Sequence, residues 1–197
     1  MKVTKATKSQ TNQLNIQTGD FYDGTHALQV RISGEVVYRS LKDGKYKGSK
    51  THCVGLNVPT GQEDKVTEPI CTAFNSHCGT AWTSDEILPL TTRTDRNGSA
   101  NTTSKTLYLT TLDQPELFDK LGNPLESILD IPVGAKVEAT FLMYCYNRSD
   151  TGELAPWKDL VSVKICEMPV RRKKFIPCEP APEEEAQAVT EDLEVLD

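Results

Sequence analysis

The chain has 197 residues, of which 25% are charged and 37% hydrophobic, and this composition is ordinary for one water-soluble globular domain. No apolar stretch is long enough to span a membrane, and the polar segment 1–18 lacks the apolar run of a secretory signal, so neither a membrane protein nor an exported one is expected. The net charge of −6 is concentrated at one end, because residues 179–197 hold eight of the 28 acidic residues and no Lys or Arg. The rest of the chain, with 20 acidic and 22 basic side chains, carries about +2.

The apolar pattern of segment 27–41 alternates and predicts a strand, with a bulge at Gly34. Asp43 and Gly44 supply a hairpin turn, and segment 46–58 returns as a second strand. A helix is predicted next, because apolar residues recur at every fourth position and place one stripe on one side. These residues are Val66, Ile70, Phe74 and Cys78. The helix is expected to reach Trp82, with Pro69 in its first turn.

Segment 89–104 is rich in Thr, Asn, Ser and Arg and almost free of apolar residues, which predicts a long mobile loop. Three more strands are predicted at 106–111, 137–146 and 159–168, with a turn at 118–124 and a loop at 147–157. The strand at 137–146 has the clearest alternation. Five strands in meander order, with one helix between the second and the third, favour a mainly β fold. The commonest small barrel of this kind is the five-stranded oligonucleotide-binding (OB) fold.

Six cysteines are spread along the chain: Cys53, Cys71, Cys78, Cys145, Cys166 and Cys178. A chain of this length can build a core without disulfides, so we expect reduced thiols and a cytosolic compartment.

Four segments resemble, in order and spacing, the single-stranded DNA-binding proteins of podovirus-type bacteriophages. They are Leu56-Asn57-Val58-Pro59 followed by a helix, segment 116–124, segment 131–137, and a strand that ends at Tyr146. The resemblance implies an OB-fold that coats single-stranded DNA during phage DNA replication and recombination, in the cytoplasm of the infected bacterial host. It also implies an acidic C-terminal tail that recruits phage replication proteins such as a polymerase or a helicase.

On this basis we divide the chain into an N-terminal extension (1–26), a single-stranded DNA-binding domain (27–170), a basic linker (171–178) and a disordered acidic tail (179–197). The tail is expected to compete with DNA for the basic surface and to bind a protein partner. Its acidic partner-binding residues are Glu183, Glu184, Glu185, Glu191, Asp192, Glu194 and Asp197. A tail that only improves solubility, or a DNA-mimic module in which the barrel is a scaffold, is the alternative.

Binding of single strands without sequence preference needs aromatic faces for bases and cations for phosphates. The predicted hairpin combines both and forms the first candidate DNA-binding patch, the hairpin patch: Tyr38, Arg39, Lys42, Lys45, Tyr46, Lys47 and Lys50. Charged edge strands that prevent aggregation would leave the same pattern. The second candidate, the strand patch, comprises Tyr144, Tyr146, Arg148, Trp157 and Lys158. In it, Tyr146 matches a tyrosine of the resembled family, whereas Phe141 faces the core. Phe74 and Trp82 are expected to pack on the helix, and the role of Tyr108 is left open.

Enzyme activity is not expected, because the chain has no phosphate-binding glycine loop, no nucleophile elbow and no metalloprotease motif. A zinc site would need the soft ligands His52, Cys53, Cys71, His77 and Cys78, but no Cys-x-x-Cys pair is present. The acidic residues Asp113, Glu116 and Asp119 raise the alternative of a metal-dependent nuclease, although acids at a turn are usually turn formers. We therefore expect no cofactor and no metal. The oligomeric state is left open.

Overall fold

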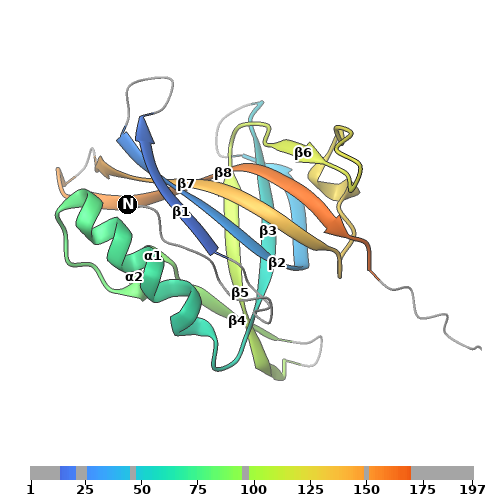
Figure 1. The fold of residues 1–197 in the computed structure, drawn as a ribbon, viewed down its shortest axis with the longest axis horizontal. Coiled ribbons are helices and arrows are strands. Elements are labelled where there is room, and N and C mark those ends of the chain that lie inside the picture. Colours follow the sequence, from blue (N-terminus) through green and yellow to red (C-terminus); the bar gives the residue numbers. More distant parts are fainter. Residues whose placement is uncertain (1–13, 21–25, 45–47, 95–97, 149–150, 170–197) are drawn as a thin grey trace, which may run out of the picture.

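The computed structural model describes residues 14–20, 26–44, 48–94, 98–148 and 151–169. These residues form eight strands, two α-helices and one short 3-10 helix, η1 (Figure 1). In chain order the elements are β1 (Leu14–Asp20), β2 (His26–Asp43), β3 (Lys50–Pro59), α1 (Glu63–Cys78), α2 (Ser84–Ile87), β4 (Leu90–Thr94), β5 (Ala100–Thr111), β6 (Glu116–Phe118), η1 (Ile128–Asp130), β7 (Lys136–Asn147) and β8 (Leu154–Glu167). Within the described part of the chain, no helix is long and apolar enough to cross a membrane.

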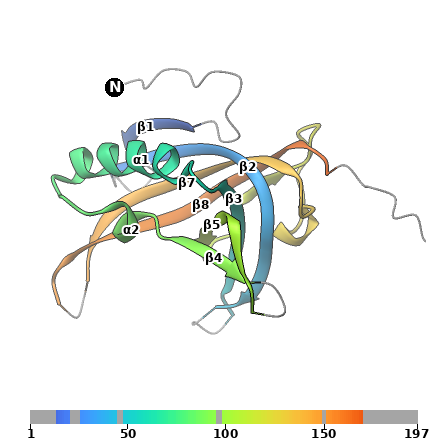
Figure 2. The ribbon, with the colours of Figure 1, turned by 90° about the horizontal axis from the view of Figure 1, so that it is seen from below.

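The long strand β2 connects two layers of the sheet. Up to Glu35 it pairs with β1 on one side and β7 on the other, and from Val36 onward it pairs with β3. The expected bulge at Gly34 is wrong, because Gly34 pairs with Val137 in regular register. The register irregularity lies between Val36 and Tyr38, where β2 changes partner, and a bulge there bends the strand. Figure 2 shows β2 curving out of the layer that contains β1 and β7 into the layer that contains β3, β5 and β4.

The strand order is β4-β5-β3-β2-β7-β8-β6, with β1 attached to β2. The ladders are antiparallel except for the parallel pair of β6 and β8. β5 and β8 lie beside each other, but no ladder joins them in the described residues, so the sheet is not closed. The predicted mainly β fold is therefore confirmed, with eight strands in place of the five expected.

The core lies on one face of β7, as the alternation of segment 137–146 predicts. Val137, Ala139, Phe141 and Met143 are buried on this face, and Cys145 packs against the core. The stripe of Val66, Ile70 and Phe74 on α1 joins the same core. Burial of these apolar faces is what holds the helix against the sheet.

Two expectations about the helix are wrong. α1 begins at Glu63, so Pro69 lies inside the helix and not in its first turn. The first turn instead holds Glu63 and Asp64, whose negative charges are favoured near the positive end of the helix dipole. α1 ends at Cys78, because Gly79 adopts a left-handed conformation with φ of 67° that closes the helix. Trp82 therefore follows the helix and is not part of it.

The expected loop at 89–104 is also wrong, because the structure places β4 and the start of β5 there. Leu90 pairs with Leu107 and Thr92 with Lys105, which makes an antiparallel pair. Thr is β-branched and favours strands, and most side chains at 91–103 that the structure describes are exposed, so no apolar alternation is needed. The last strand likewise begins earlier than expected, at Leu154, within the predicted loop 147–157.

The expectation that every thiol is reduced is wrong for one pair, since Cys78 and Cys145 form a disulfide. Their Cα atoms are 6.6 Å apart, because packing of α1 on β7 brings the end of the helix to the core side of the strand. Cys53, Cys71 and Cys166 are free thiols. Cys178 lies outside the described residues.

Candidate nucleic-acid interface

The aromatic residues of the strand patch lie together on the outer face of β7 and β8. Tyr144 is opposite Trp157 in the antiparallel ladder, and Tyr146 is opposite Ala155. The rings of Tyr146 and Trp157 meet edge to face, with centroids 5.7 Å apart and planes at 89°. Trp157 is 41% exposed, and both tyrosines are half-buried. The three aromatic side chains therefore form one solvent-accessible surface.

The Tyr144 ring is fixed by a polar contact on the same face. Its hydroxyl donates to Asp159 Oδ2 over 2.8 Å, and Asp159 stands on the neighbouring strand. A ring held in this way loses little further freedom when a ligand stacks on it. The strand patch is therefore a preorganised aromatic surface.

The two cations of the strand patch are placed differently. Lys158 is opposite Met143 in the ladder, so it starts from the core side of the sheet and not from the face that carries Trp157. Its side chain is half-buried, and this burial lowers the pKa of the ammonium. Arg148 is exposed and lies just after β7, where its backbone N–H donates to the Glu153 carbonyl. Of these two cations, Arg148 is the exposed one, and it lies at the end of the strand that carries Tyr144 and Tyr146.

In the hairpin patch, the Tyr38 ring contacts the ring of Tyr108, a residue whose role could not be assigned from the sequence. Their rings meet edge to face with centroids 5.5 Å apart and planes at 83°. Gly55 lies between them on β3: a Cβ atom there would stand 3.0 Å from Tyr38 Cβ and 3.1 Å from Tyr108 Cε1. A side chain at position 55 would collide with both tyrosines, so only glycine allows the two rings to pack over β3. No local pattern reveals this pair, because Tyr108 lies on a strand far along the chain from β2.

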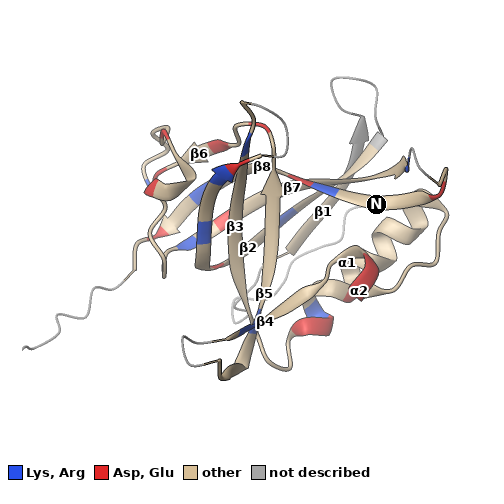
Figure 3. Ribbon diagram, turned by 180° about the vertical axis from the view of Figure 1, so that it is seen from behind, with Lys and Arg blue, Asp and Glu red and all other residues tan. Residues whose placement is uncertain are grey.

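The described cations of the hairpin patch are largely engaged with other groups. Arg39 Nε donates to the Leu129 carbonyl over 2.9 Å, and Lys50 Nζ pairs with Asp43 Oδ1 at 2.8 Å. Lys42 is exposed on the strand face that carries Tyr38. Figure 3 shows basic positions of β2 and β3 interspersed with acidic ones. Lys45, Tyr46 and Lys47 lie outside the described residues, as do all seven acidic residues assigned to the tail.

The proposed metal ligands are not gathered into one site. His52 and Cys53 are consecutive strand residues and point to opposite faces, and Cys78 is in the disulfide. Asp119 organises a turn, since its Oδ1 accepts from the backbone N–H groups of Leu121 and Asn123 at 2.8 Å each. Among the residues that the structure describes, no group of three or more His, Cys, Asp and Glu side chains is placed to hold a metal ion.

His52 is instead a buried histidine without a hydrogen-bond partner for its Nδ1 atom among the described residues. Burial lowers its pKa from 6.5, so between the lowered value and 6.5 the unfolded chain binds more protons than the folded one. We therefore expect the free energy of unfolding to fall as pH drops below about 6.5, and His52→Leu to weaken this acid sensitivity. Urea unfolding at pH 7.5 and pH 5.0 measures the free energy of unfolding at the two pH values, and His77→Gln is the control. Equal pH dependence in His52→Leu and the wild type would contradict the expectation.

Aromatic side chains on the face of a sheet are one means by which proteins bind single-stranded nucleic acid. Solved structures with a similar fold come from this class. The single-stranded DNA-binding protein from bacteriophage Enc34, in complex with single-stranded DNA, aligns with a TM-score of 0.50 and 11% identity over 78% of this chain and 96% of that one. Its C-terminal truncation aligns with a TM-score of 0.52 and 13% identity over 83% and 93%. A single-stranded DNA-binding protein encoded by bacteriophage T7 aligns at a TM-score of 0.45 and 13% identity.

At these identities the Enc34 comparisons show a shared fold. No protein-family model matches the chain, and no curated protein sequence matches it.

Proposed function

We propose that this protein binds single-stranded DNA without sequence preference and that it is not an enzyme. The observation that carries the proposal is the strand patch, in which Tyr144, Tyr146 and Trp157 form one accessible surface on β7 and β8. Every base has a π face, so such a surface binds bases of any identity, at about 1–3 kcal/mol per stacked base. The fold shared with the Enc34 protein supports the same function.

The OB-fold is part of this proposal. Strands β2, β3, β5, β7 and β8 correspond to its five strands, with α1 after the second of them. The adjacency of β5 and β8 supports this correspondence, because these two strands would complete the barrel. DNA would then bind on the outer face, where the tyrosine pair Tyr38–Tyr108 offers a second stacking surface.

The proposed setting is phage DNA replication and recombination in the cytoplasm of an infected bacterium. The supporting observation is the charge division of the chain, with a slightly basic body and an acidic segment at 179–197. In this proposal the acidic segment recruits replication proteins and competes with DNA for the same surface.

The experiment that tests the function is a fluorescence-anisotropy titration of labelled oligo-dT, random single strands and duplex DNA at two salt concentrations. Tight, salt-sensitive preference for single strands is the expected result. No binding by either the intact or a tail-deleted protein would discard the function, and would leave the acidic segment as the part that acts, on a protein partner.

Deletion of residues 179–197 is expected to strengthen binding to oligo-dT at low salt and to have less effect at high salt. The reason is that the deletion removes eight acidic charges that compete with phosphates, and salt screens that competition. The same titration measures it, with an intact chain in which the acidic residues are replaced by Gln and Asn as the control for length. Unchanged or weaker affinity after deletion would contradict competition by the tail.

A further inference from the structure

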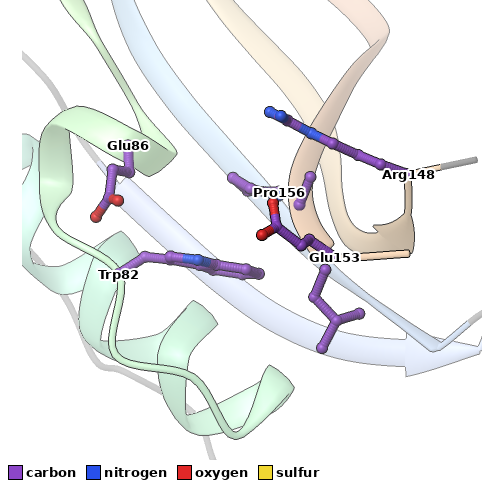
Figure 4. A pocket seen from close by; sticks show the side chains of 7 residues that line it. Trp82, Glu86, Arg148, Glu153 and Pro156 are labelled. Carbon is purple, nitrogen blue, oxygen red and sulfur yellow. The ribbon is translucent and has the colours of Figure 1, made fainter. Parts of the chain in front are cut away.

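A pocket of ≈ 400 Å³ lies between the connection from α1 to α2 and the hairpin that joins β7 to β8. The α1–α2 side contributes Trp82 and Glu86 to its lining. The side of the β7–β8 hairpin contributes Arg148, Glu153 and Pro156. Figure 4 shows the Trp82 ring between the two carboxylates, with Arg148 reaching across at the rim. The pocket combines an aromatic ring, two hydrogen-bond acceptors and one cation.

Trp82 is firmly held, so its ring is a fixed wall of the pocket. Its backbone N–H donates to Asn75 Oδ1 over 3.0 Å, and its carbonyl accepts from Asn75 Nδ2 over 2.8 Å. The ring stacks on the buried Phe74, with centroids 5.7 Å apart and planes at 23°. Phe74 covers one side of the ring, and the remainder of the ring lines the pocket.

The carboxylate of Glu86 is held as well. Its Oε2 atom accepts from the backbone N–H of Thr83 over 2.7 Å and from the Thr83 hydroxyl over 2.8 Å, and these bonds lower the pKa of the carboxyl. Glu153 faces the pocket from the hairpin (Figure 4). Neither carboxylate forms an ion pair with another residue in the described ranges. An ionised carboxylate only accepts hydrogen bonds, so a ligand here must donate them.

The pocket and the strand patch lie at the same end of β7 and β8 but on different faces of the sheet. Pro156 is opposite Cys145 on the core side, where α1 packs, whereas Trp157 lies on the outer face. Arg148 lies two residues beyond Tyr146, and Pro156 directly precedes Trp157. Two residues along a strand cover about 7 Å, close to the spacing of neighbouring nucleotides in an extended single strand. A strand that stacks on Tyr146 and Trp157 and then passes around the hairpin at Arg148 brings a following nucleotide to the pocket.

We propose that this pocket takes one base of the bound strand and favours bases that carry an amino group. This inference rests on the proposed function and adds a base preference to it. The base stacks on Trp82 and donates to Glu153 and Glu86, while Arg148 contacts the neighbouring phosphate. Guanine fits best, because its N1–H and amino group present two adjacent donors to one carboxylate. Thymine fits worst, because its single N–H is flanked by two carbonyl oxygens that a carboxylate repels.

A basic side chain of a protein partner would also donate to the two carboxylates. Arg148 argues against this occupant, because a second cation would meet its guanidinium at the rim, whereas a phosphate would bind to it. The chemistry of the whole pocket therefore favours a nucleotide.

The test compares 15-nucleotide oligo-dT with oligo-dT that carries one central dG, dC, dA or dT, by anisotropy at a fixed salt concentration. We expect the dG oligonucleotide to bind about fivefold or more tightly than all-dT, with dC and dA in between. In Glu153→Gln the ratio of dG to all-dT affinity is expected to fall toward one, because the loss of the charge weakens the contact with guanine and relieves the repulsion of thymine. Glu126→Gln, which removes an exposed acid outside the pocket, is the matched control and keeps the ratio.

Four results would overturn the inference. Equal, tight binding of all four oligonucleotides removes the base preference and leaves the proposed function intact, whereas no binding to any of them removes both. A dG preference that survives Glu153→Gln places the preference outside the pocket. A Trp82 indole NMR signal that shifts with N-acetylarginine amide and not with dGMP assigns the pocket to a basic protein partner.

Discussion

Trp157→Ala is expected to weaken binding of oligo-dT by about 5- to 100-fold at constant salt, because each stacked base contributes about 1–3 kcal/mol. Trp157 is 41% exposed, so removing its ring leaves the core intact. The slope of log Kd against log salt is expected to stay unchanged, since that slope counts phosphate contacts and not stacking. Anisotropy titrations at three salt concentrations measure both quantities. Tyr146→Ala is expected to act in the same direction, and the double variant less than additively, because the two rings touch.

Met168→Ala is the matched control, because Met168 is an exposed apolar residue just beyond the other end of β8. It should bind like the wild type. Wild-type affinity in Trp157→Ala would show that bases do not stack on the strand patch. Loss of folding in Tyr146→Ala would show that the half-buried Tyr146 ring serves the core instead.

The importance of stacking follows from how the described cations are used. Lys50 is paired with Asp43, Arg39 is bonded to a carbonyl of η1, and Lys158 starts from the core side of β8. Ion pairs at the surface contribute little to stability, but they reduce the positive charge that phosphates would meet. In the proposed function, aromatic contacts would therefore supply a larger share of the affinity than the number of described Lys and Arg residues suggests.

Strand alternation explains which parts of the fold could be predicted. In β7 every second residue is apolar, because one face meets the core, and this pattern locates the outward Tyr144 and Tyr146 correctly. β4 and the start of β5 have no such pattern, because most of their side chains are exposed on both faces, and Thr-rich sequence of this kind is also typical of loops. Their pairing depends on contacts between segments, which a local pattern does not encode.

The same limit applies to the candidate site. Trp157 could be associated with Tyr146 because a short hairpin returns the chain to the same strand pair. Lys158 could not be placed, since its face depends on where β8 begins, and that start lies within the expected loop. The pair of Tyr38 and Tyr108 depends on Gly55 of a third strand, and the pocket at Trp82 depends on a helix that ends before it. Each of these features joins distant segments.

Reduction of the Cys78–Cys145 disulfide is expected to lower the free energy of unfolding by about 3–4 kcal/mol, because the bond links residues 67 positions apart and a cross-link over so long a loop restricts the unfolded chain strongly. This effect on stability is larger than that expected from protonation of His52. The bond also ties the end of α1 to β7 at a residue between Tyr144 and Tyr146. Urea unfolding with and without a phosphine reductant measures the effect, after a thiol count confirms that reduction is complete.

Cys78→Ser and Cys145→Ser should each match the reduced wild type and lose their response to the reductant. Cys166→Ser is the control, because Cys166 is an exposed free thiol, and this variant should respond to the reductant as the wild type does. In the reducing cytoplasm proposed for this protein the bond would be open for much of the time, so the reduced form must still fold. A wild type whose stability is the same with and without reductant would show that packing of α1 on β7, and not the covalent link, holds these two elements together.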